Sequence, residues 1–205
     1  MTPRFRRFPA ALLAAGLLAS STLQAGDAAV PAERHTPLAM EAGTWDAQVT
    51  FYENGQPSGS ARGVQVNTLL ANDHWVTNDF TIPATGEFPA YQGHGVWGYD
   101  PVAGTYVNTW VDTNDRTVRT DYGYWHAPEQ TMVWSSKQSD GNGHFVDYRF
   151  TEEFRGDTRV FTAWQLGVVK PSQHLLLKIE FTRRAEAAAD AGVDGDVSPR
   201  AAPRR

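Results

Sequence analysis

The chain has 205 residues, with 18 lysines and arginines, 23 aspartates and glutamates, and no cysteine, so it can form no disulfide and carry no lipid on a cysteine. The first 25 residues hold three arginines and no acid, so a chain without them has 15 basic residues against 23 acidic ones and a net charge of −8. This charge argues against nucleic acid and anionic membrane surfaces as partners.

Residues 1–25 have the pattern of a secretory signal peptide. The three arginines are followed by a short apolar run over residues 10–18 and then by small residues, with a cleavage point after Ala25. The apolar run is much shorter than the roughly 20 residues that a membrane span needs. We therefore expect no membrane span, removal of residues 1–25, and a periplasmic or secreted location in a bacterium.

Most of the remaining chain has the alternating pattern of β-strands. Residues 26–40 are interpreted as an N-terminal linker and residues 41–184 as a single domain. In GTWDAQVTFY, Trp45, Val49 and Phe51 share one strand face and polar residues share the other. The run HLLLKIEFTRR alternates in the same way near the end of the domain.

Turn-forming clusters separate the alternating runs. The nine clusters predict ten strands: ENGQPSG, AND, PATGEF, DPVAG, TND, HAPEQ, SDGNG, RGD and KPSQ. Such short spacings favour antiparallel hairpins, because a parallel pair needs a longer crossover. A closed barrel removes the exposed sheet edges that a β-sandwich, the alternative, only protects. We therefore predict an all-β protein, an antiparallel up-and-down β-barrel of about ten strands.

The stretch GVWGYDPVAGTYVNTWVD is expected to form one hairpin around its DPVAG turn. On its second strand the aromatic face competes with Val107 and Val111 for the barrel interior. Large rings interspersed with a few polar groups are typical of a ligand cavity, so we expect the valines outside. The inward faces then supply the candidate ligand-binding residues: Trp97, Tyr99, Tyr106, Asn108, Trp110 and Asp112.

Other charged residues also alternate along strands. Arg119 shares a face with Asp121, and Asp147 shares one with Arg149. They could form a polar cluster inside the barrel or ion pairs in solvent, and the solvent-facing interpretation is favoured. His94 lies between Gly93 and Gly95, where the missing side chains would let a ligand or a neighbouring backbone approach, or would allow a strand bend.

Residues 185–205 contain no aromatic residue, leucine or isoleucine and are rich in alanine, aspartate, proline and arginine. Such a segment buries too little apolar surface to offset the entropy lost on ordering. It is predicted to be a disordered tail.

The motifs EAGTWDAQVTF, GHGVWGYDPVAGTYVNTWVD and IEFTRR resemble those of the bacterial domain-of-unknown-function family 1579. The resemblance spans most of residues 41–184, although only strand character aligns between about residues 140 and 175. It implies a secreted, calycin-like barrel and implies no particular activity.

Three residues also resemble the closure of lipocalin barrels, in which an arginine packs across the indole of a G-x-W motif. Gly43, Trp45 and Arg183 match by position, which implies that they are structural. Arg183 shares the face of Phe181, whereas Arg184 points the other way. The alternative is a core tryptophan beside an exposed arginine.

The chain contains no recognised catalytic motif: no G-x-S-x-G, P-loop or H-E-x-x-H. The leading hypothesis is therefore a calycin-like barrel that binds a small, partly apolar molecule and needs no cofactor or metal. One alternative is an enzyme at the barrel mouth with Asp112 and His94 as an acid–base pair. Another is a haem barrel, which would need an inward histidine on a late strand, but His174 lies opposite the apolar face. The oligomeric state stays open.

Overall fold

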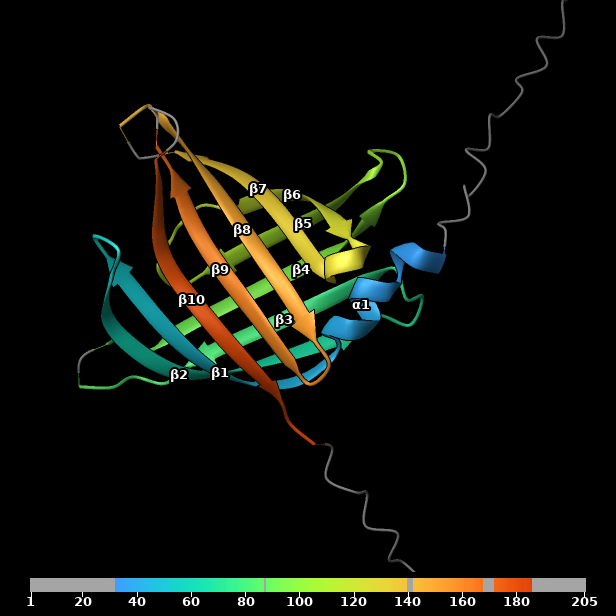
Figure 1. The fold of residues 1–205 in the computed structure, drawn as a ribbon, viewed down its shortest axis with the longest axis horizontal. Helices are drawn as coiled ribbons and strands as arrows, with labels where there is room; N and C mark the ends of the chain where they lie inside the picture. Colours follow the sequence, from blue (N-terminus) through green and yellow to red (C-terminus); the bar gives the residue numbers. More distant parts are fainter. Residues whose placement is uncertain (1–31, 87, 140–141, 168–171, 186–205) are drawn as a thin grey trace, which may run out of the picture.

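The computed structural model describes residues 32–86, 88–139, 142–167 and 172–185, so the predicted signal peptide and most of the predicted tail lie outside the described residues. Ten antiparallel strands close into a barrel in which each strand pairs with its neighbour in the chain and β10 pairs with β1 (Figure 1). The strands are β1 Gly43–Glu53, β2 Gln56–Leu69, β3 Trp75–Ile82, β4 Tyr91–Asp100, β5 Thr105–Asp112, β6 Arg119–His126, β7 Thr131–Ser139, β8 Phe145–Arg155, β9 Thr158–Leu166 and β10 Gln173–Arg183.

This architecture confirms the predicted all-β, up-and-down barrel of ten strands. Each of the nine turn clusters lies at a junction between consecutive strands. The DPVAG junction shows the expected chemistry, because the Asp100 carboxylate accepts hydrogen bonds from the backbone N–H groups of Val102 and Ala103. Gly104 then has a φ of 68°, the left-handed conformation that glycine adopts without strain.

Alternation along the first and last strands builds one half of the core. Trp45, Ala47 and Val49 of β1 are buried, and they pair across the sheet with residues of β10 that include Phe181 and Ile179. The side chains between them on β1 face outward, as the period of two requires. Their apolar face therefore joins Phe80 and Ile82 of β3 inside the barrel.

The predicted linker differs from the structure in residues 32–40. A 3-10 helix, η1 (Ala32–Arg34), and a short α-helix, α1 (Thr36–Glu41), lie at one end of the barrel (Figure 1). Pro37 stands in the first turn of α1, where its missing N–H costs no hydrogen bond. Leu38 is 1% exposed and joins the core. Six residues are too few for a helical period to emerge from the sequence, so only the contact with the barrel identifies this helix.

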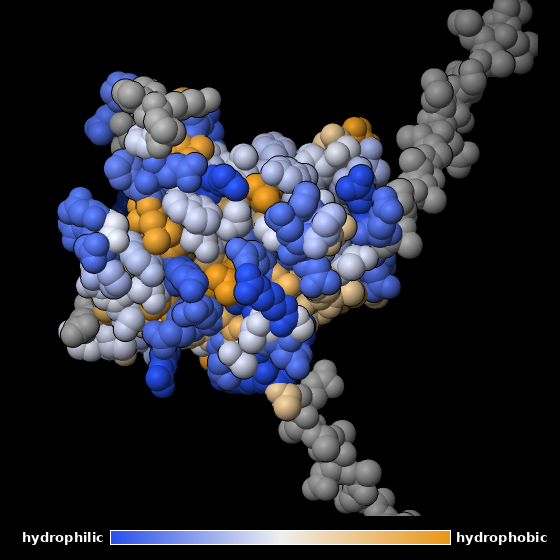
Figure 2. Space-filling model, viewed as in Figure 1, coloured by the Kyte–Doolittle hydropathy of each residue, from blue (hydrophilic) through white to orange (hydrophobic). Residues whose placement is uncertain are grey.

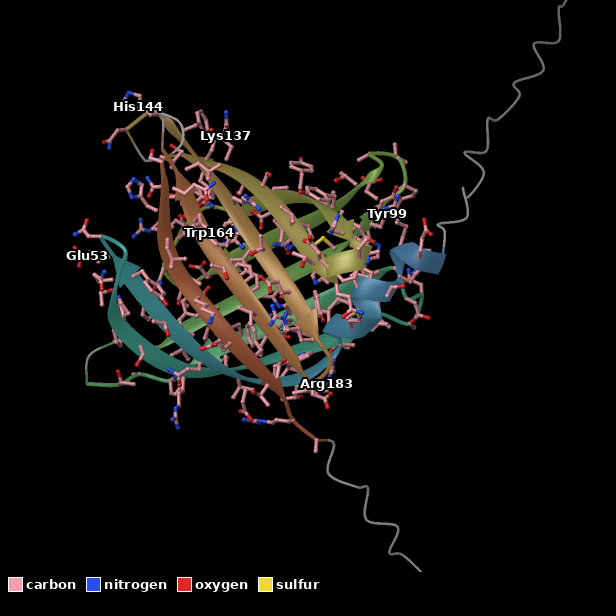
Figure 3. All side chains as sticks on the ribbon, in the orientation of Figure 1. Glu53, Tyr99, Lys137, His144, Trp164 and Arg183 are labelled. Carbon is pink, nitrogen blue, oxygen red and sulfur yellow. The ribbon has the colours of Figure 1, made fainter. Side chains whose placement is uncertain are left out.

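The two ends of the barrel are different. Tyr99 and Arg183 lie toward the end that carries α1, whereas Glu53 and His144 lie toward the opposite end, which we call the mouth (Figure 3).

The 3-10 helix η2 (Ala127–Glu129) joins β6 to β7. On the face seen in Figure 2, hydrophobic residues are scattered among hydrophilic ones. Within the described ranges, no helix has the length and apolar character needed to cross a membrane.

Candidate ligand-binding cavity

The interior of the barrel contains a cavity of about 370 Å³, within the range of small-molecule sites. Its lining runs from residues at the mouth, such as Phe88 and Asn114, down to Glu41 at the end of α1. Apolar side chains make up the larger part of the lining: Val49, Phe51, Ala61, Phe80, Ile82, Phe88, Pro89, Tyr91, Trp97, Trp110, Trp134, Phe150, Phe161, Leu177, Ile179 and Phe181. The cavity is thus mainly apolar, with a limited set of polar groups.

Four of the six candidate binding residues lie on this cavity. They are Trp97 on β4 and Asn108, Trp110 and Asp112 on β5, and their side chains are buried or half-buried. Val111, which alternates with them, is 44% exposed on the outer face. The structure therefore places the aromatic face of the hairpin inside the barrel.

Tyr99 and Tyr106 face inward but do not line the cavity. They pack nearer α1, with their ring centroids 5.2 Å apart. The Tyr106 hydroxyl donates to the backbone carbonyl of Arg34 at 2.9 Å, and the Arg34 guanidinium lies 5.0 Å from the Tyr99 ring. Burial raises the pKa of Tyr106 to about 12. These two tyrosines hold the N-terminal segment against the barrel, a partner that strand alternation does not reveal.

Trp110 fits inside because two glycines on the neighbouring strand make room for its indole. A side chain at Gly93 or Gly95 would collide with the Trp110 ring. The indole Nε1–H donates to Asp112 and to the Tyr91 hydroxyl, both at 3.1 Å. The close neighbour of both glycines is therefore the Trp110 ring, which neither of the two alternatives, an approaching ligand or backbone and a strand bend, had named.

Asp112 is a structural anchor at the mouth as well as a cavity residue. One carboxylate oxygen accepts from the Trp110 indole, and the other accepts from the backbone N–H groups of Asn114 and Asp115. Burial and the nearby Asp112 charge raise the pKa of Tyr91 to about 12, so this phenol stays neutral. The carboxylate thus fixes both the loop after β5 and the orientation of the indole.

A polar group that we call the wall cluster, consisting of Asn108, Arg119 and Asp121, projects into the cavity from β5 and β6. Asp121 is 1% exposed, and its Oδ2 accepts hydrogen bonds from Asn108 at 2.7 Å and from Arg119 Nε at 3.1 Å. The Arg119 guanidinium lies 4.8 Å from the Phe150 ring and 5.7 Å from the Trp110 ring. The second carboxylate oxygen, Oδ1, is buried and has no hydrogen-bond partner in the described part of the chain.

The solvent-facing interpretation is therefore wrong for Arg119 and Asp121. These residues share the inward face because Asp121 pairs across the sheet with Asn108, two positions from Trp110. The interpretation fits Asp147, which is 57% exposed and lies 3.5 Å from the Lys137 ammonium, and Arg149, which is exposed. The i,i+2 spacing is the same in both pairs, so only the phase of each strand distinguishes them.

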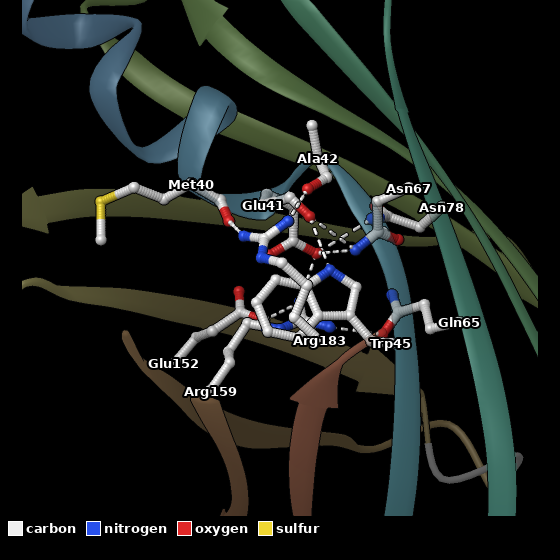
Figure 4. Close-up of polar contacts among 10 residues, drawn as sticks. All are labelled: Met40, Glu41, Ala42, Trp45, Gln65, Asn67, Asn78, Glu152, Arg159 and Arg183. Atoms are coloured by element: carbon white, nitrogen blue, oxygen red, sulfur yellow. Dashed lines mark hydrogen bonds and ion pairs between the residues drawn. The ribbon is translucent and has the colours of Figure 1, made fainter. Parts of the chain in front are cut away.

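A second polar group lies at the end of the barrel that carries α1. We call it the floor cluster, and it consists of Glu41, Gln65, Glu152 and Arg159. Arg159 on β9 is 1% exposed and pairs with Glu41 of α1 and Glu152 of β8 (Figure 4). Its Nη2 donates to Gln65 at 2.8 Å, and its guanidinium stacks 3.9 Å from the Phe181 ring. The Glu41 carboxylate also accepts from two buried amides, Asn67 at 2.7 Å and Asn78 at 3.1 Å.

Sequence reasoning missed the floor cluster, although strand alternation contains a signal for two of its members. Arg159 lies two residues from Phe161 in TRVFTAW and so shares its strand face. Glu152 lies two residues from both Phe150 and Phe154 in FTEEF and shares theirs. Each therefore belongs to an apolar, inward face. Glu41 carried no such signal, because it is the last residue of the short helix α1 and precedes the alternating pattern of β1.

The floor carboxyls are strongly perturbed by burial. Burial raises the pKa of Glu41 to about 8 from an ordinary value of 4.5, and the Arg159 charge opposes that rise only in part. The pKa of Glu152 is raised as well, for the same reason. One guanidinium between two buried carboxyls favours the retention of a proton on the pair.

The closure residues Gly43, Trp45 and Arg183 lie together beside this cluster. The Arg183 guanidinium is 4.1 Å from the Trp45 ring and donates to the backbone carbonyls of Met40 and Ala42 (Figure 4). The indole Nε1–H donates to the Glu41 carbonyl at 2.9 Å. Gly43 has a φ of 124°, and a side chain there would collide with Arg183. Arg184 instead pairs with Asp46 on the outside.

The structure does not bring together the acid–base pair of the enzyme alternative. His94 faces outward and forms a 2.8 Å contact with Asp79, whereas Asp112 faces the cavity. His174, at the start of β10, is exposed. Within the described ranges, no group of three or more histidine and carboxylate side chains is arranged to hold a metal ion.

Two solved structures share the fold. The crystal structure of Rv2717c from M. tuberculosis superposes with a TM-score of 0.53 at 11% identity, covering 76% of this chain and 99% of that one. The S-type phycobiliprotein lyase CPES from Guillardia theta superposes with a TM-score of 0.50 at 10% identity, covering 73% of this chain and 92% of that one. No curated protein matches the chain in sequence.

A family model, described as a protein of unknown function (DUF1579), matches residues 30–183. This match covers α1 and all ten strands, and so includes both ends of the cavity. The chain belongs to the DUF1579 family.

Proposed function

We propose that this protein is a secreted or periplasmic β-barrel that binds a small, partly apolar molecule inside the barrel. The observation that carries the proposal is the cavity of about 370 Å³. A closed barrel could fill its interior with side chains, as this one does around Leu38, Tyr106 and Met132, which do not line the cavity. Between the mouth and Glu41 the barrel instead leaves space between aromatic rings, as a binding site for one small molecule requires.

The lining suits a ligand with one apolar and one polar part. Aliphatic and aromatic side chains from β1, β2, β3 and β10 form one side of the cavity, and the wall cluster on β5 and β6 faces it. Apolar burial supplies affinity, and a few fixed polar groups supply orientation. The name of the phycobiliprotein lyase describes that protein, and at 10% identity its likeness supports the fold alone.

The test is titration with N-phenyl-1-naphthylamine, a neutral dye that fluoresces in apolar surroundings. We expect saturable binding of one dye per chain. The variant Ala61→Phe places a ring in the cavity, because Ala61 is buried and lines it. It should weaken dye binding by at least about tenfold, equivalent to about 1.4 kcal/mol.

The matched control is Val111→Phe, which adds the same ring on the outer face. Dye binding should stay close to that of the unaltered protein. Binding that does not saturate, or equal losses in the two variants, would place the dye outside the cavity and overturn the proposal.

A further inference from the structure

We propose that the polar end of the ligand is a cation, a protonated amine, that binds beside Asp121 of the wall cluster. This inference rests on the proposed function and names the class of ligand. It is carried by the charges that line the cavity and by the hydrogen-bonding groups that remain unused there.

The first observation is the sign of the charge inside the barrel. The cavity lining in the described part of the chain contains four carboxyl side chains, Glu41, Asp112, Asp121 and Glu152, and one basic side chain, Arg119. Arg159 and Arg183 beside the floor carboxyls add two further positive charges, so the floor of the cavity is close to neutral when its carboxyl pair retains a proton. The part of the lining nearer the mouth holds Asp112 and Asp121 against Arg119 alone. That part is negative by one charge, and it favours a cation over an anion.

The second observation is which groups lack a partner. Oδ1 of Asp121 and Oε2 of Glu41 are buried without a hydrogen-bond partner among the described residues, and both side chains line the cavity. A buried acceptor without a partner destabilises the site, because it has lost its hydrogen bonds to water. An ammonium group carries only donors, so a small shift of the Asp121 side chain toward it would pair Oδ1 of Asp121.

Arg119 does not make the wall cluster an anion site. Its Nε–H is already paired with Asp121, and its guanidinium lies between the rings of Phe150 and Trp110. An anionic group that approached it would also meet the carboxylates of Asp112 and Asp121 on the same side of the cavity. The cost of removing that anion from water would not be recovered.

The aromatic lining favours the same sign. Rings of Tyr91, Trp97 and Trp134 line the cavity, and the negative face of an aromatic ring attracts a cation. An alkyl or aryl amine therefore matches both parts of the site, with its apolar body against the aliphatic side and its ammonium against the wall cluster.

The experiment compares three ligands that share one alkyl chain and differ only in the head group: octylamine, octanol and octanoate. Each is titrated at neutral pH into the unaltered protein loaded with the naphthylamine dye. We expect octylamine to displace the dye with at least about tenfold higher affinity than octanoate, equivalent to about 1.4 kcal/mol, and octanol to lie between them. Equal affinities, or tighter binding of octanoate, would overturn the cation proposal.

The variant Asp121→Asn then locates the head group. The amide keeps an oxygen for Asn108 and Arg119 but removes the charge. Octylamine affinity should fall by at least about fivefold while octanol affinity stays unchanged, because only the amine uses the charge. Asp147→Asn, an equivalent change on the exposed outer face, should leave all three affinities unchanged. An equal loss for octylamine and octanol in Asp121→Asn would contradict the assignment to this residue.

These outcomes separate the two proposals. Dye binding without any preference for the amine overturns the cation inference and leaves the apolar binding function standing. Failure of the dye to bind the unaltered protein overturns the binding function itself. The head-group comparison needs no variant, so a folding defect in Asp121→Asn would not affect it.

Discussion

The floor cluster and the wall cluster both pair an arginine with carboxylates inside one barrel, yet they differ in how completely they are enclosed. Arg159 is 1% exposed and is bound by three of the protein's own side chains, Glu41, Glu152 and Gln65. Arg119 is 24% exposed, has one carboxylate partner and faces the cavity. The difference indicates that the floor cluster attaches α1 to the barrel, whereas the wall cluster is available to another molecule.

The largest expected effect is at the centre of the floor cluster. Arg159→Met should lower the free energy of unfolding by about 3–5 kcal/mol, because it leaves two buried carboxyls without their shared cation. Urea denaturation followed by tryptophan fluorescence measures the loss. The control Arg155→Met removes an exposed arginine at the end of β8 and should change the midpoint little. A similar small change for both variants would show that the floor cluster does not hold the fold.

A smaller effect is expected at the closure pair. Arg183→Ala removes two hydrogen bonds to the end of α1 and the contact with Trp45, which together should cost about 1–3 kcal/mol. Arg184→Ala removes only an exposed pair with Asp46 and should change stability little, because solvent screens such pairs. Equal small losses in urea melts of the two variants would contradict the lipocalin-like role of Arg183.

A further expected effect, spread over several pH units, is a pH dependence that originates in the floor cluster. The pKa of Glu41 is about 8 in the folded protein and ordinarily 4.5, so between these values the folded chain holds a proton that the unfolded chain releases. Stability from this group therefore falls as the pH rises through the window, by at most about 1.4 kcal/mol per pH unit, and levels off above it.

The measurement is the urea midpoint at several pH values between about 5 and 9, which covers most of the range between the unfolded and folded pKa values of Glu41. Glu41→Gln mimics the protonated side chain and should flatten the dependence, because the titrating group is gone. Asp147→Asn, which removes a carboxylate from the outer face, should retain the slope of the unaltered protein. A Glu41→Gln variant that keeps the full slope would assign the proton to another group.

Much of the fold could be predicted because each signal was local. Alternation marks strand faces, and turn residues mark strand ends, so the ten strands and the closed barrel follow from short stretches of sequence. The inward face of β5 was also predictable, because Trp110 and Asn108 have to share one side of their strand and Val111 the other. The family motifs in GTWDAQVTF and GVWGYD agree with this assignment.

What only the tertiary structure decided is the set of polar partners. Glu41 and Arg159 are 118 residues apart in the chain, and nothing local to either residue indicates that they meet. Arg119 and Asp121 share a strand face by their i,i+2 spacing, but exposed charges have the same spacing. Their inward position depends on which face the closed sheet turns toward its interior. Strand alternation determines two faces, but barrel closure and the helix across its end determine which charges are enclosed together and which remain open to the cavity.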